Sequence, residues 1–184
     1  MKKFLTLIVL ITIIHSCQEQ KKEYLLKKSN IKNISFEMPI DFLLKKANSE
    51  DTDIYDIFSN KKSIGTIYFG SYYKPFVEDY SITEEREIYK KVSSKGAKIF
   101  YTPNLEEDYK NGVFNDNYYY YDTINKNIAQ VMLPKKSTKG SIGIYFDSID
   151  VRKNKFVIIS NDLSEENKKT FLEIFETIKV KPTQ

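Results

Sequence analysis

Alternation of apolar and polar residues recurs in short segments along most of this chain, and no other sequence feature constrains its fold as strongly. Within residues 33–40, the apolar residues Ile34, Phe36 and Met38 alternate with polar ones, which is typical of a half-buried strand. Comparable segments cover residues 53–59, 63–68, 98–102, 117–123, 127–133, 141–146 and 155–161. Short connections at residues 60–61 and 123–126 predict hairpins. The sequence therefore predicts a mainly antiparallel β-sheet.

Two capping patterns predict helices. Ser81–Glu84 has the pattern of a capping box, and Gly96 is placed to end the helix that would follow. Asp162–Glu165 has the same pattern and predicts a helix running to about Lys179. The spacing of its apolar residues predicts one buried face: Phe171, Ile174, Phe175 and Ile178. The predicted fold class is α+β, with two amphipathic helices flanking the antiparallel sheet.

The N-terminus has the order of parts found in export signals. Lys2 and Lys3 precede the apolar run Phe4–Ile14, which is too short to span a bilayer as a helix but suits a signal peptide. The sequence Ile14–Cys17 that follows resembles the bacterial lipobox. That resemblance implies cleavage before Cys17 and a covalent lipid on its thiol. The predicted organisation is a lipoprotein signal peptide (1–16), a lipidated tether (17–30) and a single α+β domain (31–184).

The residues after Cys17 bear on localisation. Gln18 stands where Asp retains many lipoproteins in the inner membrane, so the resemblance implies an outer-membrane lipoprotein. Acids and lysines mix in Gln18–Glu23, loosely as in surface-exported lipoproteins, and both a periplasmic and a surface-facing domain stay open. The predicted partners include the lipid bilayer, reached through the acyl anchor.

The cysteine and histidine content excludes several chemistries. Cys17 is the only cysteine and His15 the only histidine, so the cleaved, lipidated chain would hold no histidine and no free thiol. This excludes a disulfide within the domain, a Ser-His-Asp triad and a Cys-His pair. We predict no cofactor besides the covalent lipid on Cys17. The net charge of +4 comes from lysines interspersed with acids, which is typical of a solvated surface and predicts no nucleic-acid partner.

Both ends of the predicted domain resemble one fold family. Ile34–Pro39 is similar to the opening strand of PsbP/Mog1-like domains, and Phe171–Lys179 is similar to their closing helix. The resemblance covers about Ile31–Lys181 and implies an α/β/α sandwich. It also implies an adaptor or accessory role, since this family shares no catalytic residues.

Tyrosines form the most unusual local feature. Tyr118, Tyr119, Tyr120 and Tyr121 are consecutive, and in a strand two of these rings would point to each face. With Tyr72 and Tyr73 they could form an aromatic platform for a sugar, a peptide or a partner protein. The alternative is a strand packed between the core and a covering loop, with the phenol groups reaching water.

Acidic clusters give weaker signals. Residues 51–56, 106–108 and 115–117 carry several carboxylates and amides, but none matches an EF-hand loop. We therefore predict solvated turns and no metal site. The sequence favours a non-catalytic envelope lipoprotein that binds a protein partner; one specific form is an immunity-type lipoprotein that blocks a toxin. The alternatives are a carboxylate-dependent envelope hydrolase and a small-ligand carrier with an aromatic pocket.

Overall fold

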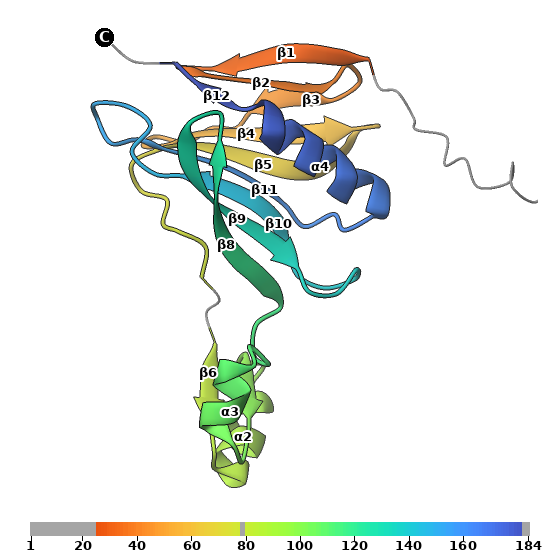
Figure 1. Cartoon of the computed structure of the whole chain (residues 1–184). Helices are drawn as coiled ribbons and strands as arrows, with labels where there is room; N and C mark the ends of the chain where they lie inside the picture. The colour runs from red at the N-terminus through yellow and green to blue at the C-terminus, as the bar shows by residue number, and fades with distance from the viewer. Residues whose placement is uncertain (1–24, 78–79, 182–184) are drawn as a thin grey trace, which may run out of the picture.

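The computed structural model describes residues 25–77 and 80–181, and its largest element is a seven-stranded antiparallel sheet, the main sheet (Figure 1). In spatial order its strands are β3 (Leu43–Lys46), β4 (Asp53–Ser59), β5 (Lys62–Gly70), β11 (Lys155–Ser160), β10 (Ile142–Phe146), β9 (Asn127–Pro134) and β8 (Asn117–Ile124). Both predicted hairpins are confirmed, β4–β5 and β8–β9. Their turns, Asn60–Lys61 and Asn125–Lys126, have positive φ at both residues, which matches the twist of paired strands.

A smaller sheet lies over the main one. It contains β1 (Leu26–Ile31), β2 (Ile34–Pro39) and β12 (Lys179–Val180), with β2 in the middle. The strand predicted at residues 33–40 is confirmed as β2. The predicted boundary between tether and domain at residue 30 is wrong, because residues 26–30 belong to β1 and pair with β2. Residues 26–30 are mostly polar and show no alternation of apolar and polar side chains, so their sequence did not predict a strand. They form one because they pair with β2.

Helix α4 (Glu165–Thr177) closes the core between the two sheets (Figure 1). All four apolar residues predicted for its inner face are buried, which confirms the helix and its orientation. The helix ends at Thr177, two residues before the predicted end, because Lys179 pairs with β2 in strand β12. The core gathers side chains from β2, the main sheet and α4, among them Phe36, Phe146, Phe156, Ile158 and Phe171. One hydrophobic core therefore joins the N-terminal strand, the sheet and the C-terminal helix.

The first predicted capping box is wrong. Residues Ser81–Thr83 form strand β6, which pairs in parallel with β7 (Ile99–Tyr101), and helix α2 (Arg86–Ser93) begins only afterwards. Ser81, the predicted N-cap, lies within β6, and the Thr83 hydroxyl accepts a hydrogen bond from the Glu85 N–H at 3.1 Å. Pairing with β7 satisfies the backbone that a helix would have used. Gly96 does follow this helix, with φ of +78°.

A small lobe contains α2, β6, β7 and the unpredicted helix α3 (Leu105–Lys110). In Figure 1 the lobe projects beyond one end of β8, away from α4. Helix α2 packs against β6 and β7 in this lobe, not along the main sheet as expected. The structure is thus a mixed α+β fold that is mostly antiparallel sheet, with α4 as the helix that packs on the core.

Candidate functional site

The main sheet has a second packed face, opposite α4. Along β11, Phe156 and Ile158 point into the core, so Val157 and Ile159 point to the other side. There they meet Tyr145 of β10. The rest of this second cluster comes from β5, β9 and β8 (Tyr68, Met132 and Tyr119) and from the chain that follows β5 (Tyr73 and Phe76).

Residues 71–77, here called the strap, form neither helix nor strand and lead from β5 toward the small lobe (Figure 1). Two strap residues, Tyr73 and Phe76, pack on this face and cover part of it. The Phe76 N–H donates to Gln130 Oε1 at 2.8 Å, and Gln130 Nε2 donates to the Phe76 carbonyl at 3.4 Å. Gln130 is buried, so these bonds satisfy an amide that would otherwise be costly to bury. The side chain of Gln130 therefore holds the strap on β9.

Aromatic rings fix the strap further. The Tyr73 ring lies 4.9 Å from that of Tyr68 and 6.4 Å from that of Tyr145, measured between centroids. The Phe76 ring lies over Gly143, where an added Cβ would come within 2.8 Å of Phe76 Cζ. A glycine in a buried strand therefore makes room for this ring.

Two open grooves flank Tyr73 and Ile159, which line both of them. The first groove, of about 610 Å³, runs toward the start of β8 and is also lined by Phe76, Tyr119, Met132, Lys98, Asp116, Asn117 and Ser141. The second, of about 580 Å³, runs toward the β11–α4 loop and is also lined by Thr66, Tyr68, Lys62, Asn161 and Asp162. Both grooves combine apolar and aromatic side chains with polar groups at one end.

Ionised groups mark the end of the first groove. Asp116 accepts from Lys139 at 2.7 Å and lies 3.4 Å from Lys98. Burial alone would raise the pKa of Asp116, but the hydrogen bonds from Lys139 and Lys98 outweigh it and hold that pKa below its usual range. Asp116 therefore stays ionised at neutral pH.

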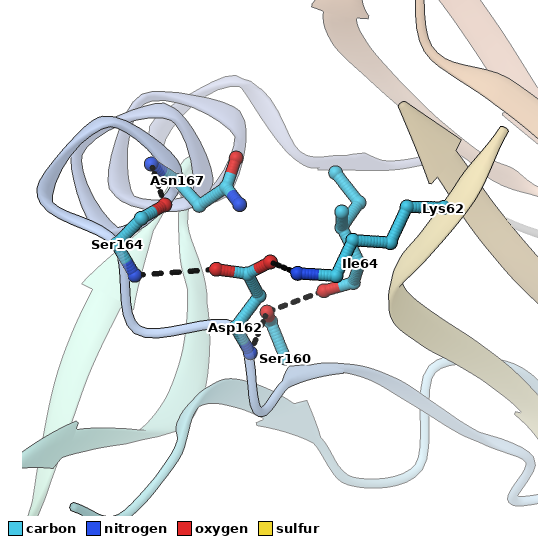
Figure 2. Close-up of polar contacts among 6 residues, drawn as sticks. All are labelled: Lys62, Ile64, Ser160, Asp162, Ser164 and Asn167. Atoms are coloured by element: carbon cyan, nitrogen blue, oxygen red, sulfur yellow. Dashed lines mark hydrogen bonds and ion pairs between the residues drawn. The ribbon is translucent and has the colours of Figure 1, made fainter. Parts of the chain in front are cut away.

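The second groove ends at Asp162, shown in Figure 2. Asp162 Oδ2 accepts from Lys62 Nζ at 2.7 Å, and Oδ1 accepts from the Ser164 N–H at 3.2 Å. The hydrogen bond from Lys62 is the main reason that the pKa of Asp162 falls to about 2, against the opposing effect of burial. Ser160 donates to the Ile64 carbonyl and accepts from the Asp162 N–H, so the loop is fastened to β5.

The second capping box is displaced from its predicted place. The N-cap of α4 is Ser164, whose hydroxyl accepts from the Asn167 N–H at 3.3 Å, and not Asp162. The Asp162 carboxylate instead forms an ion pair with Lys62, which also lines the second groove. The sequence pattern therefore located the helix start within two residues but assigned the wrong capping side chain.

The Asp162 ion pair gives an expected pH dependence. Because its folded pKa lies below the ordinary value of 3.8, its stabilisation is present above about pH 4 and is lost as the pH falls toward 2. We expect Asp162→Asn to lower the free energy of unfolding by about 1–2 kcal/mol at pH 7. Urea unfolding at several pH values should show the difference from wild type shrinking below pH 4, and Lys62→Met should behave alike. A difference that is constant down to pH 2 would contradict this account.

The structure divides the six predicted tyrosines. Tyr73 and Tyr119 meet in the second cluster, and Tyr121, two residues on from Tyr119 and near Tyr145, shares their face. Tyr118 and Tyr120 lie on the opposite face of β8, where Lys135 Nζ is 5.4 Å from the Tyr118 ring centroid. Tyr72 is exposed on the strap.

Sequence reasoning did not identify Gln130, Phe76, Met132 or Tyr145 as part of this site. Only Gly143 offered a signal, because a glycine inside an otherwise apolar strand indicates close approach by another group.

The acidic clusters are engaged in other ways. Asp53 pairs with Lys46 and Lys32, and Asp108 accepts from the Thr102 hydroxyl. Over residues 25–77 and 80–181, no three acidic, histidine or cysteine side chains come together as a metal site would require.

The predicted signal peptide and the lipid on Cys17 lie outside the described residues. In the part of the chain that the structure describes, no helix has the length and apolar character needed to cross a bilayer. Comparison with known proteins finds no matching family model and no similar curated protein.

Proposed function

We propose that this chain is an outer-membrane-anchored lipoprotein whose domain acts as a non-catalytic adaptor, binding an envelope protein across the strap face. The observation that carries the proposal is the pair of open grooves flanking Tyr73, each of which is lined in part by aromatic side chains and ends in an ion pair. Tyrosine-rich surfaces with a polar rim are typical of protein interfaces. Open grooves suit an extended segment of a partner better than a small molecule, which would favour an enclosed pocket.

Electrostatics favours binding over hydrolysis. A general acid needs a raised pKa, whereas lysines lower the pKa of both groove carboxylates, Asp116 and Asp162. These two carboxylates also line different grooves, so neither can act as the partner of the other. A carboxylate-dependent hydrolase is therefore the weaker reading of this face.

The finer fold assignment is part of the same proposal. The two segments that resemble PsbP/Mog1-like domains pack against each other: the Glu37 N–H of β2 donates to Thr177 Oγ1 of α4 at 2.9 Å. We place the domain near that family, with the strap covering the sheet face where a second helical layer would lie. Members of that family act mostly as adaptors or accessory subunits, which supports a binding role for this domain.

Site-specific photo-cross-linking in the native host tests the proposal. Tyr121 and Tyr118 are exposed on opposite faces of one strand, at 68% and 59%, so they form a matched pair. With benzoylphenylalanine at Tyr121 or Tyr72, we expect one abundant adduct in envelope fractions, and little or none from Tyr118. Fatty-acid labelling of wild type and Cys17→Ser in the same cells checks the anchor.

The outcomes separate the parts of the proposal. Equal adducts from Tyr121 and Tyr118, or none from Tyr121 and Tyr72, would reject the strap face as the binding surface. Undiminished lipid labelling of Cys17→Ser would reject the anchor without bearing on the binding surface.

A further inference from the structure

Exposed aliphatic side chains gather where the described chain begins. Leu25, Leu26 and Ile40 are 75%, 53% and 57% exposed. They are neighbours, because the Ile40 N–H donates to the Leu25 carbonyl at 2.8 Å and Leu26 lies opposite Pro39 in the β1–β2 ladder. We call these three residues the entry patch. Leu43, three residues after Ile40 at the start of β3, is exposed as well.

The entry patch lies close in sequence to the predicted lipid. Eight residues, 17–24, connect the lipid-bearing position to Leu25, and even fully extended they reach only about 26–29 Å. A lipid on Cys17 therefore holds this end of the domain within one tether length of a bilayer. Such a short tether gives the patch a high effective concentration at that surface.

We propose that the entry patch seats the domain on the lipid surface, with Leu25, Leu26 and Ile40 in contact with the acyl boundary. The inference rests on the proposed anchor at Cys17 and adds an orientation to it. Exposed leucine and isoleucine are side chains that interfacial segments bury in this layer. In Figure 1 the chain enters the small sheet at one end, beside the N-terminal end of α4, so this end faces the bilayer.

Apolar contact, not charge, drives this seating. A cavity of about 720 Å³ beside the patch is lined by Asp41, Asp162 and Glu166, and Lys62 is the cationic side chain among its described lining residues. At the patch itself, Lys27 Nζ donates to the Ile40 carbonyl at 3.0 Å. Acids and lysines therefore mix around the patch, and such a mixture gives no strong attraction to anionic headgroups. We therefore expect the seating to be insensitive to salt and to occur equally on neutral and anionic membranes.

Contact of the entry patch with the bilayer would also set the orientation of the strap face relative to the membrane. Asp162, Lys62 and Ile64 line both this cavity and the second groove, so that groove opens beside the bilayer. A partner bound there would meet the domain at the membrane surface.

An environment-sensitive probe tests the seating on the full lipidated chain. Lipid occupies the only native thiol, so Ile40→Cys supplies one reactive thiol for an NBD label. Val151→Cys is the matched control, since Val151 is 78% exposed in the β10–β11 loop. That loop lies at the opposite end of β1, where Asn33 Nδ2 donates to the Ile149 carbonyl at 2.9 Å.

In phosphatidylcholine vesicles, with or without phosphatidylglycerol, we expect NBD at residue 40 to shift to shorter wavelength and brighten several-fold. NBD at residue 151 should keep its emission in water. Adding Leu25→Ser and Leu26→Ser to the labelled Ile40→Cys protein should reduce the shift, and high salt should not. Equal emission from residues 40 and 151 in protein that floats with the vesicles would overturn the seating while leaving the anchor intact.

A lipid-free comparison excludes other occupants. In Cys17→Ser protein without vesicles, we expect NBD at residue 40 to show the emission that it has in water. A probe already shielded there would show that the chain itself or a second copy covers the patch, and would overturn the proposal; dilution distinguishes these two. Failure of the lipidated protein to float would instead count against the proposed anchor.

Discussion

Replacing Phe171 with alanine is expected to lower the free energy of unfolding by about 3–5 kcal/mol. Phe171 is fully buried on the inner face of α4, where its ring lies 6.3 Å from that of Phe175. It packs directly over β5, since a Cβ added at Gly65 would come within 2.8 Å of Phe171 Cζ. Urea unfolding followed by far-UV circular dichroism measures the change.

Leu172 provides the matched control on the same helix. It is the next residue, but it is exposed, so Leu172→Ala should cost less than about 1 kcal/mol. Equal losses from the two substitutions would mean that α4 does not pack on the main sheet through this face. In that case α4 would not close the core between the two sheets.

The sequence predicted well those elements in which the spacing of apolar residues matches the period of a strand or a helix. In β2, Phe36 and Met38 alternate with polar residues and are buried as predicted. In α4, Phe171 and Ile174 recur at helical spacing and are buried together. A strand or helix that is buried on one side needs apolar residues at every second position or at helical spacing, and this pattern can be recognised in a single sequence.

The elements that were missed owe their structure to distant partners. β1 is largely polar and exists because β2 pairs with it, and β12 is two residues long and pairs with the same strand. Ser81–Thr83 has a helix-start sequence but forms β6, because β7 supplies a parallel ladder. Local propensity is a weak prior where tertiary pairing satisfies the backbone.

The candidate site was predicted only in part for the same reason. The tyrosine run identified Tyr119, and Tyr73 was suggested as an extension, and both lie in the second cluster. The residue that joins the strap to the sheet is Gln130, 54 positions from Phe76, and no local pattern connects them. The sequence also left open which of the four consecutive rings share a face with the strap, because that depends on the packing of β9.

Releasing the strap should have the largest effect on the candidate site. We expect Phe76→Ala to lower the free energy of unfolding by about 3–4 kcal/mol, because its buried ring fills the space over Gly143. Gln130→Leu removes the amide and leaves the buried Phe76 N–H unpaired, at a cost of about 1–3 kcal/mol. In both variants, chymotrypsin should cleave faster after Tyr72 or Tyr73, which limited proteolysis with mass spectrometry detects.

Val77→Ala is the control, since Val77 is the neighbouring strap residue and is exposed. It should change neither the unfolding free energy nor the cleavage rate appreciably. Among the residues that the structure describes, the core around α4 shares no buried side chain with the second cluster, so a released strap should leave the far-UV spectrum close to wild type. Where the rest of the fold is retained, the adduct from benzoylphenylalanine at Tyr121 should fall several-fold in Phe76→Ala and fall less in Val77→Ala, since Val77 lines the first groove but is exposed. An adduct that survives release of the strap would show that a partner contacts β8 alone, and that the grooves beside Tyr73 take no part in binding.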